Sequence, residues 1–97
     1  MATYVVLAQF TDQGIRTIKN SPQRAEQVAE IAKGFGCDMR EIYWTLGHYD
    51  IVAIVDAPDE QSFTALGLAL GSAGNVRTQT LRAFTKSEFG AIVGRLA

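Results

Sequence analysis

The segment spanning residues 43 to 55 has the clearest hydrophobic pattern in the chain. It reads YWTLGHYDIVAIV, which predicts two strands joined by a tight turn at Gly47 and His48. The second of these strands is apolar on both faces, and such a strand needs a covering layer on each side of its sheet. A chain of 97 residues supplies one such layer from its own helices. We therefore expect another copy of the chain, or a ligand, to cover the other side.

Alternation of apolar and polar positions extends the strand pattern to four segments. The predicted strands cover residues 4–10, 38–46, 51–57 and 75–85. The first strand is also largely apolar on both faces, and the TDQG run at 11–14 ends it with turn chemistry. The fourth strand is the most polar, which suits the edge of a sheet.

Three further segments have the spacing of amphipathic helices. The first begins at Ser21, which can cap it, followed by a proline tolerated at the first helical position, and ends at Gly34 or Gly36. Asp59 caps the second, which closes between residues 71 and 74, and Ser87 caps a short C-terminal helix. Their apolar stripes are Ala25, Val28, Ala29, Ile31 and Ala32; Phe63, Leu66, Leu70 and Ala73; and Phe89, Ile92, Val93 and Leu96.

The resulting order, β-α-β-β-α-β plus a terminal helix, predicts a single domain over residues 1–97 with a ferredoxin-like α+β fold and an antiparallel four-stranded sheet. Right-handed crossovers place both main helices on one face. The other face, with Val52, Ile54 or their neighbours, is then a large apolar patch. Two sheets packed face to face about a two-fold axis would bury it. Alternatively, the C-terminal helix folds over part of the face or exchanges with a neighbour; dimers and higher assemblies both fit.

Composition and charge limit the kinds of partner and the cellular compartment that we expect for this protein. Net charge is −1 and 20% of residues are charged, which leaves no basic footprint for nucleic acid. The apolar runs are too short to span a membrane, and the N-terminus lacks a secretory pattern, so we expect a cytoplasmic protein. Cys37 is the only cysteine; it cannot form an intrachain disulfide or, with one histidine, a structural zinc site. It follows a helix C-terminus and is expected to be a packing residue.

The turn between the second and third strands holds the candidate catalytic residues His48, Tyr49 and Asp50. His48 is the natural general base or metal ligand because its pKa ordinarily lies near neutrality. With Asp50 and Asp56 it could hold a metal weakly, although the spacing is not diagnostic. The structural alternative has Gly47 at a positive φ, Asp50 accepting backbone hydrogen bonds and Tyr49 packing its ring.

Candidate ligand-binding residues are Tyr43, Trp44 and Arg82. Tyr43 and Trp44 point to opposite faces of their strand, so at most one of them faces a cavity or an interface. Arg82 shares a face with Thr78 and Thr80, a polar stripe that suits an anionic group or the solvated margin of a sheet edge. The glycines between residues 67 and 74 lie within or after a helix, which excludes a phosphate-binding loop.

Several separated motifs resemble the GYD domain family across essentially the whole chain. They are YWTLGHYD at 43–50, DAPD at 56–59, GNVRT at 74–78 and AFT at 83–85. The resemblance implies a fold similar to the dimeric α/β-barrel group. The family signature falls on Gly47, Tyr49 and Asp50, and it implies no role for the intervening His48.

These features favour a homo-oligomer that binds a small molecule between the sheet and a partner subunit. An alternative is a small dimeric α/β-barrel enzyme, oxygenase- or isomerase-like, using His48, Tyr49 and Asp50. The chain offers no second acid or base beside them, which favours the non-enzymatic interpretation, and nothing in the sequence names a cofactor. A third alternative is a structural module whose assembly is itself the function.

Overall fold

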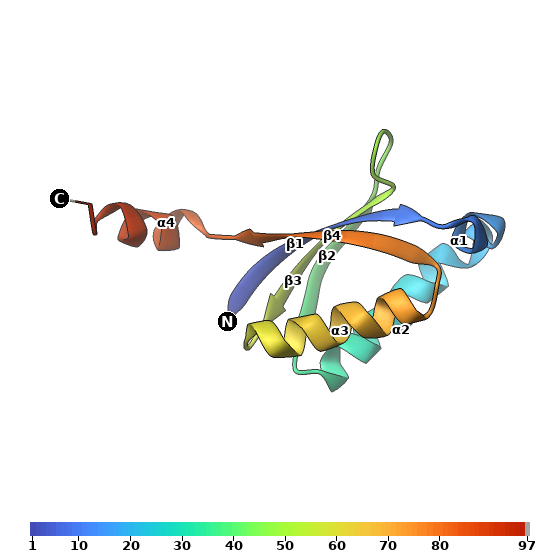
Figure 1. Ribbon diagram of the computed structural model, residues 1–97, viewed down its shortest axis with the longest axis horizontal. Helices are drawn as coiled ribbons and strands as arrows, with labels where there is room; N and C mark the ends of the chain where they lie inside the picture. Colours follow the sequence, from blue (N-terminus) through green and yellow to red (C-terminus); the bar gives the residue numbers. More distant parts are fainter. Residues whose placement is uncertain (97) are drawn as a thin grey trace.

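The computed structural model describes residues 1–96 and has the expected α+β architecture (Figure 1). Its elements are β1 (Ala2–Phe10), α1 (Asp12–Arg16), the 3-10 turn η1 (Ile18–Asn20), α2 (Ser21–Gly34), β2 (Asp38–Trp44), β3 (Ile51–Ala57), α3 (Glu60–Ser72), β4 (Val76–Ala83) and α4 (Lys86–Val93). The sheet order is β2-β3-β1-β4, with every pair antiparallel. This confirms the ferredoxin-like prediction, including β4 at an edge.

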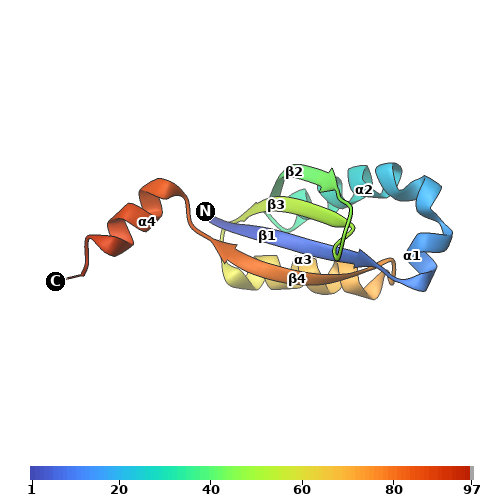
Figure 2. The same cartoon turned by 90° about the horizontal axis from the view of Figure 1, so that it is seen from above.

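Helices α2 and α3 cover one face of the sheet, and the core lies between them and the sheet (Figures 1 and 2). Tyr4 in β1 is central to it: only 6% of the residue is exposed, and its ring stacks on Phe63 of α3 with centroids 4.1 Å apart. The other buried members of this cluster are Ala32, Cys37, Val55, Ala57 and Leu66. Burial raises the pKa of the Cys37 thiol, and Asp59 adds to the effect, in keeping with a packing role.

The opposite face of the sheet has no helix over it in residues 1–96, as the strand pattern predicts (Figure 1). In register, Val5 of β1 lies between Ile54 of β3 and Leu81 of β4, and Leu7 pairs with Val52. We call this apolar set, together with Tyr43, which pairs with Val52, the open face. Tyr43 is 54% exposed and Leu81 46% exposed. The apolar residues of the two edge strands are thus exposed, and Val5, Leu7, Val52 and Ile54 of the central strands are only partly buried by their own chain.

Two of the predicted helix boundaries follow local chemistry. The Asp59 carboxylate accepts from the backbone N–H of Ser62 at 2.7 Å, which lowers its pKa and confirms the predicted cap of α3. Gly36 follows α2 at φ +76°, a conformation that glycine adopts at little cost.

Two other caps differ from prediction. Thr85, rather than Ser87, caps α4, because it forms a reciprocal capping box with Glu88 three residues later. Those bonds lower the pKa of the Glu88 carboxyl. Ser21 lies inside the first turn of α2 instead of capping it, and its hydroxyl accepts from the Trp44 indole at 2.9 Å. The Ser21 oxygen, which the local sequence predicts to cap the helix, thus bonds to Trp44 from a distant part of the chain.

A short helix, α1, replaces the simple turn expected after β1. Thr11 caps it by accepting from the Gly14 N–H, and the Thr11 hydroxyl itself donates to the Gly74 carbonyl at 2.6 Å. The contact with the segment before β4 is very close: a Cβ placed on Gly14 would lie 2.0 Å from the Asn75 carbonyl oxygen. Glycine is required here for space.

The C-terminal helix α4 projects beyond the end of the sheet, away from α2 and α3 (Figures 1 and 2). It makes the molecule 53 Å long although only 18 Å thick. Its apolar side chains Phe89, Ile92 and Val93 are exposed, and so is Leu96 beyond its end. The structure therefore does not have α4 folded over its own open face, and exchange with a neighbouring copy stays a prediction.

We expect Gly14→Ala to lower the free energy of unfolding by about 2–3 kcal/mol, because backbone atoms must shift to admit the methyl group. Gly67→Ala in α3 is the matched control: nothing lies within 4 Å of its added Cβ, and we expect no loss or a gain of about 0.5–1 kcal/mol. Urea denaturation followed by circular dichroism measures both. Equal stabilities of the two variants would contradict the close-contact interpretation.

Candidate functional site

The turn that joins β2 to β3, residues 45–50, is a well-bonded hairpin on the side of the sheet opposite the helices (Figure 1). Thr45 N–H donates to the Asp50 carbonyl at 2.8 Å, and the Thr45 hydroxyl donates to the Tyr49 carbonyl at 2.6 Å. Gly47 has φ +110°, which confirms the positive φ predicted there. Leu46 and His48 are exposed beside it. The hairpin therefore presents one apolar and one titratable side chain to the solvent.

The candidate catalytic residues lie together in this hairpin, but two of them already have partners. Asp50 accepts from the Phe10 backbone N–H at 2.9 Å through its carboxylate, and its own N–H donates to Ala8 at 2.8 Å. The Tyr49 hydroxyl donates to the Gln79 side chain of β4. The His48 ring is edge-on to the Tyr49 ring at 4.9 Å. Asp50 and Tyr49 thus fasten the hairpin to β1 and β4, and catalysis by these three residues stays a prediction.

The structure also separates the acidic residues considered for a metal. Asp56 accepts from the Thr3 hydroxyl at 2.8 Å and pairs with Arg40 at 2.8 Å, away from the hairpin tip. No group of three His, Cys, Asp or Glu side chains within residues 1–96 is arranged to hold a metal ion. In the same part of the chain, no helix is both long and apolar enough to cross a membrane.

The three candidate ligand-binding residues occupy separate places. Tyr43 lies on the open face, where a hydrogen bond with Glu41 and the charge of that residue raise its pKa. Trp44 lies on the helix side and donates to Ser21. Arg82 lies over the rings of Phe84 and Tyr4, 4.5 and 5.6 Å from their centroids, and donates to the Thr3 carbonyl at 3.2 Å. The predicted opposition of Tyr43 and Trp44 is confirmed, and no common site joins the three.

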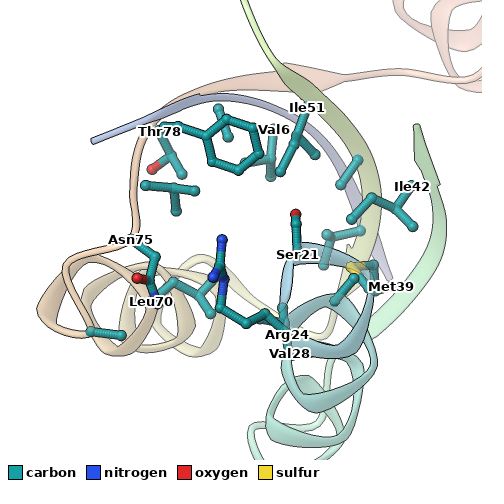
Figure 3. A pocket seen from close by; sticks show the side chains of 17 residues that line it. Val6, Ser21, Arg24, Val28, Met39, Ile42, Ile51, Leu70, Asn75 and Thr78 are labelled. Atoms are coloured by element: carbon teal, nitrogen blue, oxygen red, sulfur yellow. The ribbon is translucent and has the colours of Figure 1, made fainter. Parts of the chain in front are cut away.

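Sequence reasoning missed a cavity of about 120 Å³ between the sheet and the helices α2 and α3 (Figure 3). It lies on the face opposite the one where we expected a pocket against a partner subunit. Small side chains create the space, since Ala8 and Ala53 form part of its sheet wall and Ala25 part of its helix wall. Its polar lining residues are Ser21, Arg24, Asn75 and Thr78. The alanines facing one another were the sequence signal for this cavity.

Comparisons with known proteins support the overall fold. The GYD domain family model matches residues 4–93. A Thermus thermophilus protein named glutamine synthetase and cystathionine beta-lyase binding protein is 38% identical over 84 residues, covering 86% of this chain and 88% of that one. The crystal structure of TTHA0845 from the same organism superposes with a TM-score of 0.57 at 26% identity, covering 88% of this chain and 95% of that chain.

We expect Asp50→Ala to lower the free energy of unfolding by about 1.5–3 kcal/mol, because it removes a charged acceptor from the Phe10 N–H. His48→Ala, two residues away and exposed, should change it by no more than about 0.5 kcal/mol. Thermal and urea unfolding of both variants give the comparison. A destabilised His48→Ala with an unchanged Asp50→Ala would reverse the assigned structural roles.

Proposed function

Because this chain belongs to the GYD domain family, we propose that it is a self-associating module that binds another protein. The open face carries the proposal: Val5, Leu7, Val52 and Ile54 of the central strands are only partly buried on this side, while helices cover the other side of the sheet. Exposed apolar area of this kind is typical of interaction surfaces. The relative named for binding glutamine synthetase and cystathionine beta-lyase supports a protein-binding role.

A second copy of the chain is the occupant we assign to the open face. The apolar residues of the open face lie mainly on the two central strands, β3 and β1, and the Arg40–Asp56 ion pair lies towards the β2 edge. Two copies related by a two-fold axis would therefore place the apolar strands of one sheet against those of the other. Helix α4 supports the same conclusion. Its stripe, including Phe89 at 57% exposed, lies beyond the reach of its own core and would be buried only by another molecule.

The hairpin tip is the surface we assign to the protein partner. Leu46 is fully exposed at the tip, beside Gly47 and the exposed His48. The hydrogen bonds within residues 45–50 and those from Asp50 and Tyr49 hold the tip in place without using these side chains. A preorganised apolar residue loses little entropy on binding, which suits it to act as an anchor.

The other functions considered for this chain have less support. In the enzyme alternative, Asp50 and the Tyr49 hydroxyl would have to leave their partners before they could act on a substrate. In the structural alternative, the oligomer would form but bind no further protein. A small molecule held between two sheets would appear as extra mass on the assembled protein.

Ile54→Asp should convert the oligomer to a folded monomer, because an unpaired carboxylate on a buried apolar interface costs about 3–5 kcal/mol. Leu68→Asp, which adds the same charge to an exposed apolar residue of α3, is the matched control and should keep the assembly state. Native mass spectrometry, with a chain mass of 10.5 kDa as the unit, distinguishes the states. A wild-type monomer, or an Ile54→Asp variant that stays assembled, would overturn the self-association.

Leu46→Asp should weaken binding to the glutamine synthetase or cystathionine beta-lyase of the organism that encodes this chain by at least about tenfold. The assembly state should not change. Surface plasmon resonance with each purified enzyme measures the affinity, and Asn20→Asp on the exposed η1 turn, which changes the net charge by the same amount, is the control. If wild-type protein binds neither enzyme, the relative's partners do not extend to this chain. Equal binding by wild type and Leu46→Asp would exclude the hairpin tip as the contact.

A further inference from the structure

The cavity beneath the sheet combines an apolar body with a cationic group at one side. Apolar side chains from both layers make up most of its wall: Val6, Ala8, Val28, Ile42, Ile51 and Leu70. The Arg24 side chain extends from α2 into this space, with its guanidinium between Asn75 and Ser21 in the view of Figure 3. Cavities of this size are uncommon in proteins, whose interiors are packed about as densely as organic crystals. An apolar cavity of this kind can accept a ligand.

Arg24 has no carboxylate partner in the described part of the chain. The ion pairs there are Lys33 with Glu30 and Arg40 with Asp56. The guanidinium instead donates to the Thr17 carbonyl at 2.9 Å, to the Thr17 hydroxyl at 2.8 Å and to the Gly14 carbonyl at 3.3 Å. A guanidinium has more N–H donors than these three bonds use. No carboxylate within residues 1–96 therefore neutralises the Arg24 charge, and N–H donors remain for a further acceptor.

Neighbouring groups add donors without adding negative charge. The Ser21 oxygen, in a residue only 4% exposed, accepts from Trp44, which leaves its O–H proton free to donate. The Asn75 side-chain oxygen accepts from Gln13, which leaves its NH₂ group free in the same way. Ser21 and Arg24 are three residues apart on one helix and thus lie on the same side of it. The polar part of the cavity is a set of donors that matches an anion.

We propose that this cavity binds a small carboxylic acid with an apolar body, with the carboxylate on Arg24 and Ser21. The planar guanidinium suits a carboxylate, to which it can give two parallel hydrogen bonds. A cavity of about 150 Å³ holds a benzene ring, so the space here fits an apolar body of about five carbons. The site lies within one chain and is independent of the open face, so it does not rest on the proposed function.

The test compares 4-methylpentanoate with its amide, 4-methylpentanamide, which has the same shape and no charge. Trp44 is the only tryptophan and its indole is bonded to Ser21 at the cavity wall, so its emission reports on the site. Methyl NMR shifts of Val6, Val28 and Leu70 locate the ligand independently. We expect the acid to shift these signals in a saturable manner and the amide to bind at least about tenfold more weakly.

Variants separate the charge from the cavity. Arg24→Gln should weaken binding of the acid about tenfold and leave binding of the amide nearly unchanged, whereas Arg16→Gln, an exposed arginine of α1, should change neither. Ala53→Leu should fill the cavity and abolish binding of both compounds. Equal binding of acid and amide by the wild type would overturn the anionic assignment. No saturable shift with either at millimolar concentration would overturn the site, and the wild-type comparison decides even if Arg24→Gln does not fold.

Discussion

The structure depends on one imbalance. The two central strands are apolar on both faces of the sheet, but the helices of the chain cover only one face. β1 and β3 each place alternate residues in the core and on the open face, as the pairs Tyr4–Val55 and Val5–Ile54 show. Right-handed crossovers put α2 and α3 on the same side, so the chain cannot cover the other side with either helix. The exposed apolar area and the projecting α4 both follow from this arrangement, which makes association the simplest way to bury them.

The same imbalance gives the two faces different chemical roles. On the open face, side chains are large and apolar, and the space beyond them can be filled only from outside the chain. On the helix side, small alanines at positions 8, 25 and 53 leave a cavity that Arg24 enters from α2 (Figure 3). A broad apolar face suits contact with another protein, whereas a small cavity lined with hydrogen-bond donors suits a small anion. One sheet thus separates a proposed assembly surface from a proposed ligand site.

The signature hairpin is explained largely by its own bonding. Asp50 holds the end of β1 through the Phe10 N–H, Tyr49 reaches Gln79 of β4, and Gly47 takes the positive φ that the tight turn needs. The contacts of Asp50 and Tyr49 fix the position of the hairpin relative to β1 and β4. The exposed side chains of Leu46 and His48 at the tip take no part in these bonds and are free to contact another molecule.

Local patterns in the sequence determined the strands, the two main helices, the ferredoxin-like order and the uncovered face, because alternation, helical spacing and crossover handedness act over short stretches of chain. They also placed Asp59 as a cap and Gly47 at a positive φ. The tertiary structure alone decided that Ser21 bonds Trp44 instead of capping α2, that Gly14 packs on Asn75, and that Arg24 enters a cavity. Each of these depends on residues far apart in the chain coming within a few ångströms, which no local pattern encodes.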